Sequence, residues 1–195
     1  MNHMTIETPR LIIRPFVKGD FAIHRILDQE FGEAGSDRAA LKDPKSWLGW
    51  QILSEEWFRR MRQPPYGDQA ITVKKGNQLV GAVGYVPCLE PFEQIPELRG
   101  PSQPSRYCTT ELGLFYAIDP EYRRQGYASE AAQAMLQYAF RQLHVRRVIA
   151  MTDYANVASQ NVMRKLGMKI TRNPLPEPRW LQIVGVLENP GRGMD

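Results

Sequence analysis

Residues Asp119–Met135 read DPEYRRQGYASEAAQAM and combine a polar turn with the start of a long alanine-rich segment. Small and apolar residues in and beyond this stretch recur at the i, i+3, i+4, i+7 spacing of one buried helix face. They are Ala128, Ala131, Ala132, Met135, Leu136, Ala139, Phe140 and Leu143. The pattern predicts a helix over Gly126–Leu143 that starts close to Gly126 and buries a small-residue face on a sheet.

The turn that enters this helix is rich in groups that bind anions. The first turn of a helix carries unpaired N–H groups and the positive end of the helix dipole. Arg123, Arg124 and Gln125 come directly before it. Gly126 allows the backbone to approach a ligand closely, and Ala128 keeps the next outward position small. The turn is therefore interpreted as a cradle for a phosphate or pyrophosphate.

The alternative interpretation of the turn is a glycine-containing loop with two solvated arginines. The sequence has neither the P-loop signature nor the dinucleotide signature G-x-G-x-x-G. The nature of the anion therefore depends on the rest of the chain.

The remaining segments predict a mixed sheet with helices, which is an α/β or α+β fold. Strands are expected at Arg10–Phe16, Gln69–Val73, Gln78–Val86, Thr109–Ile118, Arg146–Thr152 and Trp180–Leu187, the second and third forming a hairpin. Helices are expected after Asp20 and at Lys45–Met61, Gly126–Leu143 and Asn156–Leu166. The unit from Glu111 to Thr152 must then be a parallel, right-handed strand–helix–strand crossover.

Composition excludes several classes of protein. The 195 residues are 43% hydrophobic and 24% charged, which is typical of one globular domain, and no apolar window is long enough to span a membrane. The apolar run Leu11–Ile13 is too short for a secretory signal, so we expect a cytoplasmic protein. The net charge of +4 is spread along the chain, which argues against a nucleic-acid partner. Cys88 and Cys108 are expected to be ordinary thiols, and no metal site is expected from the histidines and cysteines.

Three motifs, in order along the chain, resemble those of the GNAT superfamily of N-acyltransferases. Arg123–Ala128 (RRQGYA), between a strand and a long helix, is similar to the acyl-CoA-binding pattern Q/R-x-x-G-x-G/A. Asn156–Met168 is similar to the family's N-x-x-[AS] helix that ends in K-L-G-[FM]. Thr8–Pro15 (TPRLIIRP), with Asp20, resembles the opening of the branch that contains the ribosomal-protein acetyltransferases RimJ and RimL.

This resemblance implies a fold and a domain. Residues 1–195 would form a single acyl-CoA N-acyltransferase domain. Its central sheet would be mixed and mostly antiparallel, with one parallel strand–helix–strand unit and flanking helices.

The resemblance also implies where acetyl-CoA would bind as a co-substrate. Tyr116, Ala117 and Ile118 would pair through their backbone with the pantetheine arm. Backbone amides of the turn would hold the pyrophosphate, and the binding residues there are Arg123, Arg124, Gln125, Gly126, Tyr127, Ala128 and Ser129. Tyr127 is expected to cover the cofactor or pack beside it. Asn156 would reach the CoA arm, the alternative being a helix N-cap alone, and Ser159 would assist it.

The chemistry needs a group that takes a proton from the amine. In one type of GNAT site a glutamate lies five residues before the asparagine and a tyrosine seven after it. Met151 and Met163 occupy these positions and cannot exchange a proton. Glu111, on the strand that leads to the cofactor turn, is the expected general base, because alternation along the strand could turn it toward an acceptor cleft. A salt-bridged or solvated glutamate is the alternative.

Two further segments are candidates for walls of the acceptor site. Lys45–Met61 predicts an amphipathic helix whose aromatic stripe is expected to be core, an acceptor-pocket wall being the alternative. The stripe comprises Trp47, Trp50, Leu53, Ser54, Trp57, Phe58 and Met61. Pro87–Cys108 contains five prolines and is expected to be a long loop that serves as a lid, a binding loop or an oligomer contact. His24 is expected on the surface of the helix that Asp20 caps.

The expected function is that of an acetyl-CoA-dependent N-acetyltransferase acting on a primary amine of a small molecule or of a protein N-terminus. The alternative is a non-catalytic acyl-CoA-binding or sensing module, which the two methionines favour. The expected partners are acetyl-CoA and an amine acceptor, with no metal, nucleic acid or membrane. A homodimer is expected, because Trp180–Leu187 is apolar enough to be buried at a sheet edge or a dimer seam.

Overall fold

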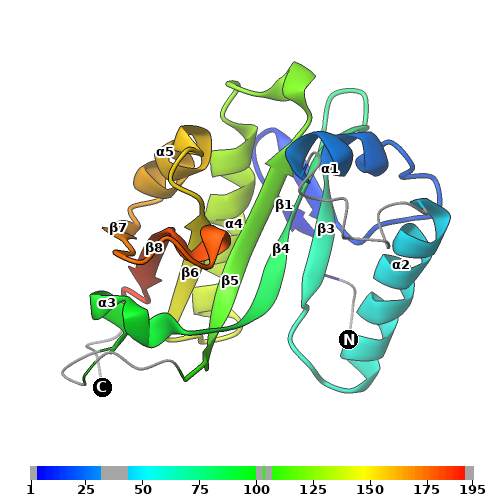
Figure 1. Ribbon diagram of the computed structural model, residues 1–195. Helices are drawn as coiled ribbons and strands as arrows, with labels where there is room; N and C mark the ends of the chain where they lie inside the picture. Colours follow the sequence, from blue (N-terminus) through cyan, green and yellow to red (C-terminus); the bar gives the residue numbers. More distant parts are fainter. Residues whose placement is uncertain (1–3, 32–43, 100–102, 104–106, 192–195) are drawn as a thin grey trace. The chain divides into compact units, whose positions relative to one another are not determined.

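The computed structural model describes residues 4–31, 44–99, 103 and 107–191 (Figure 1). The chain divides into two compact units, which are described separately. The first unit comprises Met1–Tyr85 and Phe115–Met135, and the second comprises Val86–Leu114 and Leu136–Asp195. Strands β4 (Gln78–Glu90) and β5 (Thr109–Ile118) and helix α4 (Tyr127–Arg141) each contribute residues to both units.

Eight strands make up a mixed, mostly antiparallel sheet, which confirms the predicted fold class. In the first unit, β1 (Ile6–Glu7), β2 (Leu11–Arg14), β3 (Gly67–Val73) and β4 pair in that order, each antiparallel to the next. In the second unit, β6 (Arg147–Thr152) pairs in parallel with β5, with Gly113 opposite Ile149. Strand β8 (Ile183–Glu188) lies between β6 and β7 (Lys169–Arg172), antiparallel to both. The predicted parallel β5–α4–β6 crossover is therefore present.

Two helices supply much of the core of the first unit. Helix α1 (Ile23–Phe31) and helix α2 (Pro44–Arg60), labelled in Figure 1, belong to this unit. Both contribute buried side chains, and α2 contacts β3. The cluster consists of Phe16, Ile23, Ile26, Leu27, Trp47, Leu48, Ala70, Ala82 and Ala117. His24 is buried here and lies edge-on to Trp47, with 5.6 Å between ring centroids, so its predicted surface position is wrong. Packing of α1 against α2 turns this histidine inward.

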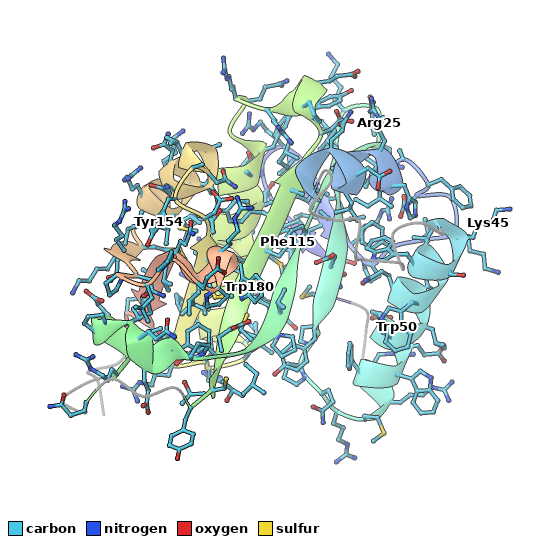
Figure 2. All side chains as sticks on the ribbon, viewed as in Figure 1. Arg25, Lys45, Trp50, Phe115, Tyr154 and Trp180 are labelled. Atoms are coloured by element: carbon cyan, nitrogen blue, oxygen red, sulfur yellow. The ribbon has the colours of Figure 1, made fainter. Side chains whose placement is uncertain are left out.

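The aromatic stripe of α2 is divided between core and surface. Trp47 and Ser54 are buried as predicted. The exposed members of the stripe are Trp50, Leu53 and Trp57, on another face of the helix, and Met61, directly after its end; they are 47% to 63% exposed. The prediction that the whole stripe is core is therefore wrong. Figure 2 shows Trp50 projecting from α2.

The segment between β2 and α1 is held in place by an ion pair between Arg14 and Asp20. The Asp20 carboxylate accepts two hydrogen bonds from the Arg14 guanidinium, at 2.7 and 2.9 Å, and one from the Val17 backbone N–H at 2.8 Å. Asp20 thus stabilises the loop after β2, whereas the sequence predicted a helix cap.

The predicted hairpin of β3 and β4 is confirmed. Asn77 (φ 50°) and Gly76 (φ 89°) take the left-handed conformation that a tight hairpin turn requires. The second strand is longer than predicted, because it continues to Glu90.

The segment Pro87–Cys108 is not one long loop. After β4 it forms a short 3₁₀ helix, η3 (Phe92–Gln94), and helix α3 (Pro96–Arg99). Phe92 and Ile95 are buried in the core of the second unit, and this apolar anchoring orders the first half of the segment. Residues 100–102 and 104–106 lie outside the described part of the chain.

The predicted last strand begins three residues late. Arg179–Leu181 forms a 3₁₀ turn, η5, and β8 begins at Ile183. Trp180 is exposed, and its indole Nε1 donates a hydrogen bond to Glu90 Oε1 at 2.9 Å (Figure 2). Because β8 is paired on both sides, its apolar character is explained by the core of this unit. The expectation that this strand lies at an edge is therefore wrong.

Among the helices of the described residues, none has the length and apolar character needed to cross a bilayer.

Candidate functional site

The end of β5 is fixed by a buried carboxylate. Asp119 is 1% exposed, accepts a hydrogen bond from Glu121 N at 3.1 Å and forms an ion pair with Arg25 of α1. It thereby caps the 3₁₀ turn η4 (Pro120–Tyr122). The backbone N–H of Asp119 also donates to Val80 O of β4 at 2.9 Å. The start of the turn is thus held rigidly against the sheet of the first unit.

The backbone of the turn adopts an unusual conformation. Arg124 has a φ of 62° and Gly126 a φ of 84°, both in the left-handed region. Glycine adopts this region freely, whereas for arginine it is strained. Strain of this kind persists where the surroundings fix the backbone, and it is concentrated at binding sites.

Helix α4 starts directly after this turn, as predicted. Its first backbone bond runs from Glu130 N–H to Gly126 O at 3.0 Å. The N–H groups of Tyr127, Ala128 and Ser129 therefore have no acceptor within the helix. Together with the positive end of the helix dipole, they form a group of donors suited to an anion.

The two arginines of the turn have different environments. Arg123 Nε donates to Ile118 O at 2.9 Å, so this side chain holds the end of β5. Arg124 is exposed, and its side chain makes no hydrogen bond or ion pair to the residues that the structure describes. Of the two predicted cations, Arg124 is therefore the one whose charge is available to a ligand.

The predicted pantetheine-binding residues lie together at the end of β5 in the first unit. The Ala117 and Ile118 side chains are buried, so these two residues can offer a ligand only backbone groups. Tyr116 is half-buried. This is compatible with the expected pairing through the backbone.

Asn156 caps helix α5 (Val157–Lys165) in the second unit. Its Oδ1 accepts a hydrogen bond from Ser159 N at 3.0 Å, and its own N–H donates to Asp153 Oδ1 at 2.8 Å. The predicted N-cap is therefore confirmed. A contact of Asn156 or Ser159 with a CoA arm stays a prediction.

Glu111 is held by an arginine of the second unit. Arg147 Nε donates to Glu111 Oε2 at 2.8 Å, and Arg147 Nη2 contacts the other carboxylate oxygen. The Glu111 side chain is 9% exposed. The hydrogen bond to Glu111 raises the pKa of Arg147 despite the opposing effect of burial. The salt-bridged alternative thus describes the structure, while the predicted role of Glu111 as a base stays a prediction.

The two methionines lie in apolar surroundings. Met163 is fully buried, and its sulfur would stand 3.1 Å from a Cβ at Gly185. Met151 packs against the core of the second unit. Neither position offers a group that exchanges protons.

The two thiols are unlike each other. Burial, with smaller effects of Glu90 and Glu111, raises the pKa of Cys88 to about 11. Cys108 is exposed. At neutral pH the Cys88 thiol is protonated and unreactive.

Sequence reasoning missed two residues that contact the turn. Arg10 belongs to the motif Thr8–Pro15, which does not indicate its contact with the turn, where it donates to Gln125 O at 2.8 Å. Glu130, in the first turn of α4, binds the Arg10 guanidinium at 2.6 Å. An acidic residue in the first turn of a helix was the available signal, although nothing in the sequence pairs it with Arg10.

Comparison with known proteins gives a consistent result. The model of the acetyltransferase (GNAT) domain family matches residues 10–169. The uncharacterized N-acetyltransferase YnaD of Bacillus subtilis is 44% identical over 170 residues, which cover 85% of this chain and 83% of YnaD. The crystal structure of a GNAT-family acetyltransferase from Bacillus anthracis aligns with a TM-score of 0.64 at 21% identity, covering 95% of this chain and 99% of that one.

A second solved structure has the same fold. It is RimL, the ribosomal L7/L12 alpha-N-protein acetyltransferase, in complex with coenzyme A. It aligns with a TM-score of 0.61 at 14% identity, covering 94% of this chain and 96% of that one. The turn before α4, the parallel β5–β6 pair and the family match over most of the chain lead to one conclusion: the chain belongs to the GNAT family of acetyltransferases.

Proposed function

We propose that the protein transfers the acetyl group of acetyl-CoA to a primary amine of a small molecule or of a protein N-terminus. The observation that carries the proposal is the turn Arg124–Ser129. It combines two residues in the left-handed conformation, an exposed cation with no partner among the described residues, and N–H groups at the start of α4 that have no acceptor within the helix. This arrangement suits the pyrophosphate of CoA.

The proposed roles of the other residues follow from the family. The backbone of Tyr116, Ala117 and Ile118 would bind the pantetheine arm. Asn156 and Ser159 of the second unit are proposed to bind CoA. The amine nitrogen attacks the thioester carbonyl carbon, a C–N bond forms, the C–S bond breaks, and the proton lost by the amine is returned to the thiolate of CoA.

Glu111 is proposed as the group that accepts the amine proton. Its pairing with Arg147 makes this demanding, because the guanidinium already donates to both carboxylate oxygens and occupies a lone pair on each. A base role therefore requires proton transfer through one oxygen while Arg147 keeps the other in place.

The exposed stripe of α2 and the residue after it, defined by Trp50, Leu53, Trp57 and Met61, is proposed as a wall of the acceptor site. These apolar side chains are exposed in the free protein, which leaves them available to an apolar part of an acceptor. The acidic residues within this stretch are Glu55 and Glu56, and Glu56 is paired with Arg60, so the stretch holds no large acidic cluster of the kind that would favour a polyamine acceptor. The first half of Pro87–Cys108 is a weaker candidate, because Phe92 and Ile95 fix it in a core.

The branch of the family, the cellular location and the oligomeric state stay proposals. The motif Thr8–Pro15 favours the RimJ/RimL-like branch, and the RimL structure shares the fold at 14% identity. That branch contains enzymes with different acceptors, so it identifies the chemistry better than the substrate. A cytoplasmic location and a homodimer remain predictions from the sequence.

A second candidate function is a non-catalytic acyl-CoA-binding module. Two observations favour it: Met151 and Met163 stand at the usual proton-handling positions, and the Glu111 carboxylate is ion-paired. Such a module would bind acetyl-CoA tightly and release no CoA.

The experiment that separates the two is an acceptor screen that measures free CoA thiol. The panel contains small aromatic and aliphatic amines, a polyamine, and peptides with free and blocked N-termini. We expect one class of primary amine to release CoA in proportion to its concentration. Saturable binding of acetyl-CoA with no release over the whole panel would support the binding module instead.

A further inference from the structure

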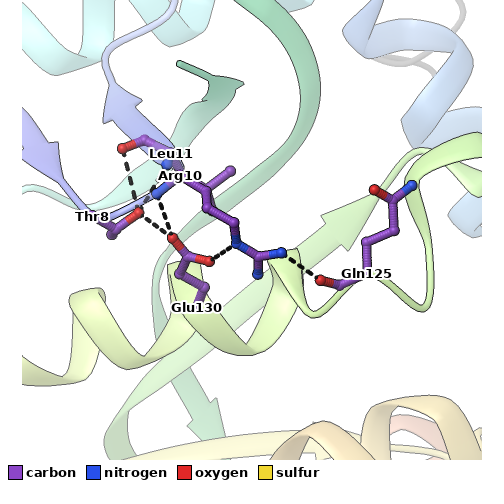
Figure 3. Close-up of polar contacts among 5 residues, drawn as sticks. All are labelled: Thr8, Arg10, Leu11, Gln125 and Glu130. Carbon is purple, nitrogen blue, oxygen red and sulfur yellow. Dashed lines mark hydrogen bonds and ion pairs between the residues drawn. The ribbon is translucent and has the colours of Figure 1, made fainter. Parts of the chain in front are cut away.

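Arg10, on the loop before β2, makes three contacts with the turn and the first helical residues of α4. Its Nη1 donates to Gln125 O at 2.8 Å, and its Nε donates to Glu130 Oε2 at 2.6 Å (Figure 3). Its guanidinium carbon lies 4.6 Å from the centre of the Tyr127 ring, a cation–π contact. One side chain thus joins three residues of the turn and the helix start.

The bond to Gln125 fixes the direction of the next N–H. In a trans peptide plane the carbonyl and the following N–H point in opposite directions. Because the Gln125 carbonyl points at Arg10, the N–H of Gly126 points away from Arg10. The contact therefore sets the direction of a donor in the turn.

The same arginine lies close to the glycine itself. A Cβ at Gly126 would stand 3.3 Å from Arg10 Nη2, at a residue whose φ is 84°. The guanidinium occupies the space beside the left-handed residue and supports its conformation.

Glu130 is the second half of this arrangement. Its Oε1 accepts hydrogen bonds from Thr8 Oγ1 at 2.6 Å and from Arg10 N at 2.9 Å, while Thr8 Oγ1 accepts one from Leu11 N at 2.9 Å (Figure 3). Burial alone would raise the pKa of Glu130, but the hydrogen bonds from Thr8 and Arg10 outweigh it and lower that pKa. Glu130 therefore holds Arg10 in place as a charged carboxylate.

A carboxylate in the first turn of α4 would repel an anionic ligand unless it is compensated. Arg10 supplies the opposite charge at 2.6 Å. Arg10 is 47% exposed, and exposed ion pairs contribute little to stability. The arrangement is thus better suited to fixing the turn than to stabilising the fold.

We propose that Arg10 is a positioning residue for the pyrophosphate of CoA, acting through the Gln125 carbonyl, the Tyr127 ring and the Glu130 carboxylate. The inference rests on the proposed function, because it assumes that this turn binds CoA. Arg10 itself need not touch the ligand.

The test is equilibrium binding of CoA and of pantetheine, which lacks the pyrophosphate, by calorimetry. Arg10→Lys keeps the charge but cannot donate to Gln125 and Glu130 in the same geometry. We expect it to weaken CoA binding about tenfold while pantetheine binding changes less than about twofold. Arg14→Lys is the matched control, because Arg14 lies on β2 and its hydrogen bonds within the described part of the chain go to Asp20 and Pro15, not to the turn. It should leave CoA binding unchanged, even where it lowers the melting temperature.

A second variant separates positioning from simple neutralisation of charge. Arg10→Met combined with Glu130→Gln removes both charges and should still bind CoA about tenfold more weakly than the wild type. Full recovery of affinity in this double variant would overturn the proposal, as would Arg10→Lys with wild-type affinity for CoA. If the wild-type protein itself does not bind CoA, the proposed function fails and not the role of Arg10 alone.

Discussion

Gly81 of β4 is in direct backbone contact with Ala117 of β5: a Cβ at position 81 would stand 2.3 Å from the Ala117 carbonyl oxygen. The two strands approach this closely because position 81 has no side chain. Ala117 is one of the three residues proposed to bind the pantetheine arm through the backbone. The contact therefore couples the packing of the sheet to the proposed binding strand.

Gly81→Ala is expected to destabilise the protein by about 1–3 kcal/mol or more, because the new methyl group meets backbone and not a movable side chain. We also expect weaker CoA binding, since Ala117 must shift. Urea unfolding and calorimetry measure the two effects. Gly49→Ala in α2 is the control, because nothing lies within 4 Å of its Cβ position and alanine favours a helix. A Gly81→Ala protein as stable as the wild type would contradict the contact.

The Glu111–Arg147 pair gives a prediction about catalysis. Glu111→Gln leaves a largely buried guanidinium with a weakened partner, so we expect a loss of about 1–3 kcal/mol in the free energy of unfolding. If Glu111 is the base, kcat should also fall about 10²–10⁴-fold, and the rise of the rate with pH should change.

The double variant Glu111→Gln with Arg147→Met separates these effects. Removing both charges should restore much of the stability, because no guanidinium is left that depends on the half-exposed Glu188, at 3.8 Å, as its remaining partner. A base role predicts that activity stays low in this variant. Activity that returns together with stability would show that Glu111 acts only through its ion pair.

Much of the fold was predictable where the pattern was long and strong. Helix α4 has eight apolar or small positions in register, and its start was placed within one residue of Tyr127. The Asn156 cap was predictable because the asparagine side chain readily accepts a hydrogen bond from a backbone N–H in the first turn of a helix, here that of Ser159. Strand β7 was missed, because KITR is four residues long and none of its side chains is fully buried.

The candidate site was predictable only in part. The turn residues follow one another in the sequence, so their shared location could be inferred. The Arg10–Glu130 contact joins residues 120 positions apart, and the partner of Glu111 is 36 positions away, so only the folded chain reveals them. The α2 stripe shows the limit of periodicity, because helical spacing marks two apolar faces without saying which one is buried.

The thiols give a prediction with a defined pH window. Because burial raises the pKa of Cys88 to about 11 from an ordinary value of 9.0, folding favours the protonated thiol. This contribution to the free energy of unfolding is complete below about pH 9. It is lost as the pH rises toward 11, because the thiol of the unfolded chain loses its proton first, and the free energy of unfolding then falls by about 2 kcal/mol. The slope of stability against pH should be smaller in Cys88→Ala. At pH 8 a thiol reagent should modify Cys108 quickly and Cys88 only after unfolding; rapid modification of both would contradict the burial of Cys88.

The two faces of α2 give a matched pair of tryptophans. Trp47 is buried and packs edge-on against Phe16, with 5.4 Å between ring centroids, so Trp47→Ala should cost about 3–5 kcal/mol. Trp50 is 61% exposed, so Trp50→Ala should change stability by less than about 0.5 kcal/mol. If the exposed stripe is a wall of the acceptor site, Trp50→Ala should raise KM for the acceptor and leave KM for acetyl-CoA unchanged. An unchanged acceptor KM would remove the stripe from the site.

Asn156 serves as a helix cap and is proposed to contact CoA, and two substitutions distinguish these roles. Asn156→Ala removes the acceptor of the Ser159 N–H and should cost about 1 kcal/mol of stability. Asn156→Ser keeps a capping oxygen, so its stability should stay close to that of the wild type, but it lacks the side-chain amide. If the amide binds the cofactor, Asn156→Ser should weaken CoA binding although the helix is intact. Wild-type affinity in Asn156→Ser, with the expected loss of stability in Asn156→Ala, would mean that the residue acts as a cap alone.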